Sequence, residues 1–182
     1  INDLINAQQQ LSTGMTVTIL DFMNRIAADR GAPLIPIIKI EESAGEEVLH
    51  MSGTAVFSGN KMIGELDGKE TRGYLWAANA VEQAVVMATV DEDRVGIEVL
   101  RASGSISPEI DENGEISMVI RTTAKGSIGS ERGKRDFTTP EGVRKLLEAF
   151  AGEIEGEIRA CLEKSKELHA DVFADVERRR EE

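Results

Sequence analysis

Apolar and polar positions near the start of the chain predict two helices followed by strands. The helices are expected at residues 2–11 and 16–29, separated by small polar residues that interrupt helical spacing. Pro33 ends the second helix, because proline cannot donate a backbone hydrogen bond. The second helix must pack one face against the rest of the protein. Its apolar residues at helical spacing are Ile19, Leu20, Met23, Ile26 and Ala27.

The next segment contains a β-hairpin. Residues 34–40 are apolar but include Pro36, which predicts either an edge strand or an extended connector. The acidic residues 41–47 are expected to form an exposed loop. Residues 48–57 and 62–66 then predict two antiparallel strands, because the small residues between them tolerate the positive φ of a tight turn.

A short helix follows the hairpin directly, and more strands follow the helix. Asp67 stands at an N-cap position with Glu70 three residues later, and the helical pattern continues to residue 80. Short connections then separate three further strands, so they are expected to pair in an antiparallel arrangement. These strands are predicted at residues 84–90, 94–106 and 115–128.

A long amphipathic helix is predicted after Pro140. Thr138 or Thr139 supplies a hydroxyl cap, and proline suits the first helical position. The helix should bury one stripe on the sheet and expose its charged opposite face. Cys161 belongs to this stripe, which favours a small core residue over a nucleophile. The stripe consists of Val143, Leu147, Phe150, Ile154, Ile158 and Cys161.

Composition narrows the range of partners. The 182 residues can hold one domain, or one domain and part of another. A formal charge of -12 would repel nucleic acid and anionic membrane surfaces. A single cysteine excludes an intrachain disulfide, and His50 and His169 lie too far apart in sequence to suggest a metal site. No leader or membrane span is found, so we expect the chain to be a fragment of a longer protein.

No phosphate loop, dinucleotide fingerprint, nucleophile elbow or zinc-protease helix is found, so no enzyme activity, cofactor or metal is predicted. The most informative segment is the short helix after the hairpin, which carries Lys69, Glu70, Arg72, Gly73 and Trp76. A glycine inside a helix suggests the close approach of another backbone or side chain. Trp76 fits either a core position or a docking surface, and Arg72 fits either an ion pair or a contact with a partner.

These residues form part of a longer pattern that resembles the C-terminal domain of the Ger(x)C family, the lipoprotein C subunits of nutrient germinant receptors in spore-forming bacteria. The similarity spans roughly residues 34–173. Residues 174–176 depart from the glycine-containing continuation common in the family, and the lipid-bearing cysteine is absent. The matching segments are Gly53-Thr54-Ala55-Val56-Phe57, Lys61-Met62-Ile63-Gly64-Glu65-Leu66, Lys69-Glu70-Thr71-Arg72-Gly73-Tyr74-Leu75-Trp76 and Ala170-Asp171-Val172-Phe173.

The resemblance implies a non-catalytic subunit on the outer face of the spore inner membrane, held by a lipid anchor beside integral-membrane A and B subunits. Residues 34–182 would form the family's α+β domain, and residues 1–33 the helical edge of a preceding domain or a connector. The fold expected is a mostly antiparallel sheet, with the long C-terminal helix and the shorter helix packed on one face. The structural or docking candidates are Lys69, Glu70, Arg72, Gly73, Trp76, Asp171 and Phe173.

Two other functions stay open. The domain could bind the germinant itself, although few aromatic residues and no convergent polar motif are seen. Hydrolysis by paired carboxylates would require acidic residues whose surroundings push their pKa values apart.

Overall fold

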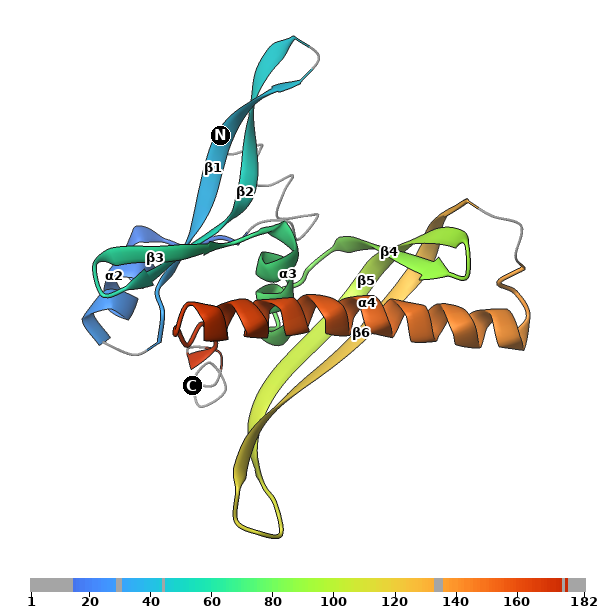
Figure 1. The fold of residues 1–182 in the computed structure, drawn as a ribbon. Helices are drawn as coiled ribbons and strands as arrows, with labels where there is room; N and C mark the ends of the chain where they lie inside the picture. Colours follow the sequence, from blue (N-terminus) through green and yellow to red (C-terminus); the bar gives the residue numbers. More distant parts are fainter. Residues whose placement is uncertain (1–14, 29–30, 44, 133–135, 175, 177–182) are drawn as a thin grey trace.

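The computed structural model describes residues 15–28, 31–43, 45–132, 136–174 and 176. The helix expected at residues 2–11 lies outside this part of the chain. The described residues form two antiparallel three-stranded sheets, a long helix near the C-terminus and shorter helices (Figure 1). The predicted α+β class is confirmed, but the strands form two sheets and not the single sheet expected from the sequence.

The first sheet has the order β1-β2-β3 and consists of β1 (Leu34–Ser43), β2 (Glu46–Ser58) and β3 (Lys61–Leu66). Residues 34–40 therefore belong to an edge strand, and the hairpin prediction is confirmed. The loop expected at residues 41–47 is wrong, because β1 and β2 pair as far as Ser43 and Glu46. This end of the hairpin extends away from the body (Figure 1), and the side chains of Glu41, Glu42 and Glu47 are exposed there.

Helix α2 (Ile19–Ala28) contacts the first sheet through an edge-to-face pair of aromatic rings. The centroids of Phe22 and Phe57 lie 5.2 Å apart. The apolar face predicted for this helix is largely exposed in the described part of the chain, since Ile19 and Leu20 are 81% and 69% exposed. The expectation that this face packs on the protein is therefore wrong for these side chains.

The second sheet has the order β4-β5-β6 and consists of β4 (Ala84–Val90), β5 (Asp93–Ile110) and β6 (Ile116–Arg132). Alternate residues of β4 are buried, as its sequence pattern predicts. β5 and β6 are longer than expected. Beyond Val99, β5 pairs with β6 alone and not with β4. This two-stranded part projects from the body on the side opposite to the β1–β2 hairpin (Figure 1), and we call residues 101–125 the arm.

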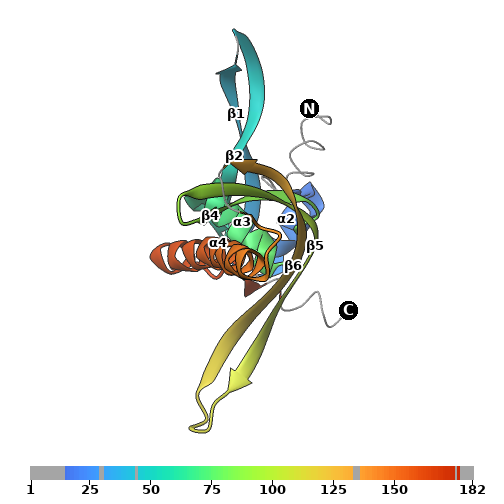
Figure 2. The same cartoon turned by 90° about the vertical axis from the view of Figure 1, so that its right-hand side faces the viewer.

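Two helices complete the fold, namely α3 (Gly68–Ala77) and α4 (Pro140–Glu167). α3 contacts strands of both sheets, whereas α4 contacts β4 and crosses α3. Figure 2 shows α4 end-on, beside α3 and to one side of β5 and β6. One core cluster includes buried residues of both sheets and of both helices. α3 is thus the element that joins the two halves of the molecule.

The buried stripe of α4 differs from the predicted one. Val143 and Leu147 are 41% and 59% exposed, whereas Leu146 is buried. The first turns of α4 bury Gly142 and Leu146, so the buried stripe begins on positions adjacent to those expected. Phe150, Ile154 and Cys161 are buried as predicted, and Glu157 is buried among them. No described helix has the length and apolar character required to span a bilayer.

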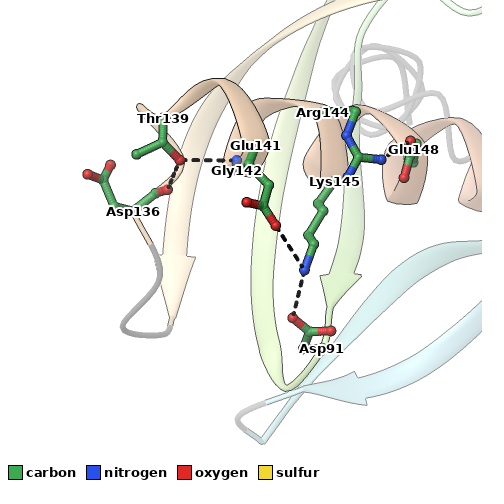
Figure 3. Close-up of polar contacts among 8 residues, drawn as sticks. All are labelled: Asp91, Asp136, Thr139, Glu141, Gly142, Arg144, Lys145 and Glu148. Atoms are coloured by element: carbon green, nitrogen blue, oxygen red, sulfur yellow. Dashed lines mark hydrogen bonds and ion pairs between the residues drawn. The ribbon is translucent and has the colours of Figure 1, made fainter.

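The start of α4 is tied to the turn between β4 and β5 (Figure 3). The Thr139 hydroxyl caps the helix by accepting a hydrogen bond from the Gly142 amide at 3.1 Å. Lys145 Nζ lies 3.7 Å from Glu141 Oε1 and 3.9 Å from Asp91 Oδ2 in the turn. Such exposed ion pairs contribute about 0–1 kcal/mol each, so the cap and the buried stripe hold this end of α4 in place.

Candidate functional site

The candidate residues after the hairpin begin with a capping box. Asp67 Oδ1 accepts a hydrogen bond from the Glu70 amide at 2.8 Å, and Glu70 Oε2 accepts one from the Asp67 amide at 2.8 Å. The reciprocal pair satisfies backbone groups that a helix start leaves without partners. The Thr71 hydroxyl lies 3.0 Å from that of Thr54 and ties α3 to β2 inside the protein. The predicted cap is therefore confirmed.

A buried carboxylate connects α3 to α4. Glu157 is 3% exposed and accepts hydrogen bonds from Arg72 and Trp76. Arg72 donates through Nε, at 2.8 Å from Glu157 Oε2, and through Nη2, while Trp76 Nε1 lies 2.8 Å from Glu157 Oε2. The hydrogen bond with Glu157 raises the pKa of Arg72 above its usual value, against the opposing effect of burial. The Arg72 guanidinium therefore stays charged where it contacts Glu157.

Glu157 was not among the sequence candidates. Its burial could have been inferred from the spacing of the sequence. Glu157 follows Ile154 by three residues and precedes Cys161 by four, which places it on the buried face of α4. A carboxylate at such a position requires a buried partner. We refer below to Arg72, Trp76 and Glu157 as the α3–α4 joint.

Gly73 allows the two helices of the joint to approach closely. A Cβ at this position would lie 2.0 Å from the carbonyl oxygen of Glu157 and 3.1 Å from Cys161 Cβ. The close approach of another backbone expected at Gly73 is therefore found. Trp76 is 1% exposed and belongs to the core. Lys69 is exposed and takes no part in the joint.

The remaining candidates, Asp171 and Phe173, lie in the segment that follows α4. The Asp171 carbonyl accepts a hydrogen bond from the Ala32 amide at 2.8 Å, and Asp171 Oδ1 accepts one from the Phe173 amide at 3.0 Å. The Phe173 ring stacks on Tyr74 of α3 with centroids 5.9 Å apart. Asp171 therefore fixes the turn that places Phe173 against α3.

Cys161 has the properties of a core residue. Its side chain is fully buried, and burial raises the pKa of its thiol to about 12. The nucleophilic form of cysteine is the thiolate, which is nearly absent at neutral pH with such a value. No group of side chains that could hold a metal ion is found within the described residues.

A groove of about 600 Å³ lies between the C-terminal half of α4 and the arm. Its lining combines apolar and charged side chains. Sequence patterns do not reveal this groove, because it is formed by segments far apart in the chain. The apolar lining residues are Ile106, Met118, Ile120, Ile158, Leu162, Ala170 and Phe173. Its charged and histidine lining residues are Glu155, Arg159, Lys166, His169 and Asp171.

Comparisons with known proteins agree with this fold. Residues 52–178 match the model of a family described as spore germination B3/GerAC like, C-terminal. The chain is also similar to the crystal structure of the GerBC protein, with a TM-score of 0.66 and 18% sequence identity over 82% of this chain. The likeness covers 45% of that chain, and the comparison with curated proteins gives no match. The expected resemblance is confirmed, and the chain belongs to the spore germination B3/GerAC-like family through its C-terminal domain.

Proposed function

We propose that this chain is the docking domain of a germinant receptor C subunit and takes no catalytic part in germination. The observation that carries the proposal is the family match over residues 52–178. In this role the domain binds integral-membrane A and B subunits, and so contributes to the assembly and signalling of the receptor. Residues 34–182 act as one unit, and residues 1–33 lead from a preceding domain or connector.

The chemistry of the buried groups supports a scaffold role. The Glu157 carboxylate accepts hydrogen bonds from Arg72 and Trp76, which leaves little capacity for proton transfer to a substrate. The Cys161 thiol stays protonated near neutral pH. Both groups hold α3 against α4, and a rigid joint between the sheets suits a domain that presents a fixed surface to partners.

Charge supports attachment through a lipid anchor on the outer face of the spore inner membrane. A formal charge of -12 opposes direct contact of this domain with anionic lipid headgroups. A lipid chain joined to another part of the full-length protein would hold the domain near the membrane without such contact. The acidic surface would then remain available to proteins.

Deletion of this domain from the full-length subunit tests the proposal in sporulating cells. Germination triggered by nutrients should be strongly impaired, whereas germination triggered without nutrients should proceed at the wild-type rate. Equal nutrient responses in the two strains would refute the docking role. Quantifying the A and B subunits in the same spores shows whether assembly or signalling is lost.

The groove gives specific support to a second function, direct binding of the germinant. A volume of about 600 Å³ lies within the range of small-molecule sites, and a lining of apolar and charged side chains suits a small amphipathic ligand. Calorimetric titration with amino acids and sugars tests this function. Saturable heat that disappears in the variant Leu162→Gln would favour it, and the absence of heat with every germinant would exclude it.

A further inference from the structure

The arm has one apolar face that continues beyond the groove. β5 and β6 pair Ile106 with Ile120, Pro108 with Met118, and Ile110 with Ile116. Alternate residues of a strand point to the same face, so these three cross-strand pairs form a single strip. The intervening positions on the opposite face are Ser107, Glu109 and Ser117, with Val119, which is half-buried.

Exposure increases along the strip from the body to the tip of the arm. Ile106 is 5% exposed, Met118 is 48% exposed, and Ile110 and Ile116 are 70% and 71% exposed. The strip extends about 13 Å from Ile106 to Ile110, since a strand rises about 3.3 Å per residue. Together with the groove it forms a continuous apolar surface, and surfaces of this kind mark sites of interaction.

We propose that this surface, the groove together with the apolar face of the arm, receives an amphipathic helix of a partner protein with basic residues beside its apolar side. The proposal names the contact surface for the docking role and rests on that proposed function.

The charges at the tip of the arm favour a basic partner. Asp111, Glu112 and Glu115 are exposed there, and residues 109–116 contain no lysine or arginine. Hydrogen bonds from backbone amides, that of Glu115 first, lower the pKa of Asp111, so it stays ionised. Lysine or arginine beside the apolar side of the partner would meet these carboxylates when Ile110 and Ile116 are covered.

The same charges act against two other occupants. A second copy of the chain would bring another formal charge of -12 and another acidic tip to the interface. An anionic membrane surface would be repelled by the carboxylates around Ile110 and Ile116. The carboxylates that repel a second copy and an anionic membrane would attract a basic protein segment.

The shape of the surface favours a helix over a strand or a small ligand. The groove is lined by side chains of α4, of the segment that follows it and of the face of the arm. An added strand would pair along a backbone edge of the arm and leave the groove and the apolar face uncovered, whereas a helix lays its apolar side into a groove of side chains. A small ligand confined to the groove would leave Ile110 and Ile116 in water.

A binding experiment with the chain itself tests the surface. The probe is a fluorescein-labelled helix of about 18 residues, or five turns, made of leucine and lysine with one apolar side. Its control is a scrambled peptide of the same composition, which has the same charge and no apolar side. The amphipathic peptide should bind at least about tenfold more tightly than the scrambled one. Equal binding would overturn the proposal, because charge alone would then explain it.

Matched variants locate the bound peptide on the arm. The double variant Ile110→Thr with Ile116→Thr retains side chains suited to strands and should weaken binding at least about tenfold. The control Leu147→Gln changes a residue on α4 that is 59% exposed and does not line the groove, and it should bind as the wild type does. Loss of binding in the control alone would overturn the proposal. The fluorescence of buried Trp76 checks that each variant is folded.

Co-purification from spores separates this inference from the proposed function. If the wild-type full-length subunit co-purifies with the integral-membrane subunits and the Ile110→Thr, Ile116→Thr variant does not, both proposals are supported. If both proteins co-purify equally, the docking role stands and the arm surface is wrong. If the wild type itself fails to co-purify, the docking role and the inference that rests on it are both wrong.

Discussion

Replacement of Glu157 by leucine tests whether the α3–α4 joint holds the two halves of the protein together. Glu157 accepts hydrogen bonds from both Arg72 and Trp76. Leucine leaves the guanidinium without its anion and the indole N–H without an acceptor. We expect the variant to fold with a much lower free energy of unfolding.

The magnitude follows from burial. Removing one partner of a buried ion pair costs about 3–5 kcal/mol, because the remaining charge stays desolvated. The Arg72 side chain is 22% exposed and retains some contact with water, which favours the lower end of that range. The unsatisfied indole adds to the cost, so a loss of about 3–4 kcal/mol is expected. A large part of the stability of an ordinary domain would be lost.

Urea unfolding followed by tryptophan fluorescence measures the effect, because Trp76 is the only tryptophan and belongs to the joint. With a slope of about 2 kcal/mol per molar urea, a loss of 3 kcal/mol shifts the midpoint by about 1.5 M. The control Glu163→Leu makes the same replacement at an exposed position of α4 and should change stability by less than about 0.5 kcal/mol. A loss below about 1 kcal/mol for Glu157→Leu would refute the reasoning.

Three further predictions use the same unfolding assay. Gly73→Ala should lower the free energy of unfolding by more than about 2 kcal/mol, because its Cβ would lie 2.0 Å from the Glu157 carbonyl oxygen. Gly156→Ala, with open space around it, should raise the free energy of unfolding by about 0.5–1 kcal/mol. Stability changes of the same sign in the two variants would contradict this account. Asp67→Ala should cost about 1 kcal/mol through loss of the cap, and a neutral result would argue against the capping box. Burial raises the folded-state pKa of Cys161 to about 12, so the unfolded chain loses the thiol proton at lower pH than the folded protein does. The free energy of unfolding should therefore fall by about 1.4 kcal/mol per pH unit as pH rises from the usual cysteine pKa towards 12. Cys161→Ala should lack this pH dependence, and identical pH profiles for the two proteins would contradict the prediction.

Much of the local structure could be predicted, because it depends on residues close together in sequence. The turn between β2 and β3, the Asp67 cap and the strands of the second sheet follow from short-range patterns. The close approach at Gly73 also follows from one unusual residue in a helix. The loop expected at residues 41–47 failed, because acidic residues are tolerated in a hairpin whose far end is surrounded by water.

The site itself depends on contacts between distant segments, which local patterns do not specify. Arg72 and Glu157 are separated by 85 positions, so nothing near Arg72 identifies its partner. The prediction for α4 failed at Val143 and Leu147, because an apolar residue is buried only where another element covers it. The neighbouring residues Gly142 and Leu146 are the ones buried against the rest of the protein. The groove requires the relative placement of α4 and the arm, which is a property of the whole fold.

Site-specific photo-crosslinking in spore membranes tests the docking role most directly. In one variant of the full-length subunit a photoreactive amino acid replaces Ile116. In a control variant of the same subunit it replaces Leu147, which lies outside the groove. The account predicts crosslinks from position 116 to an integral-membrane subunit of the receptor, and few from position 147. Crosslinks to lipid or to another copy of the same subunit, with none to the receptor, would contradict it.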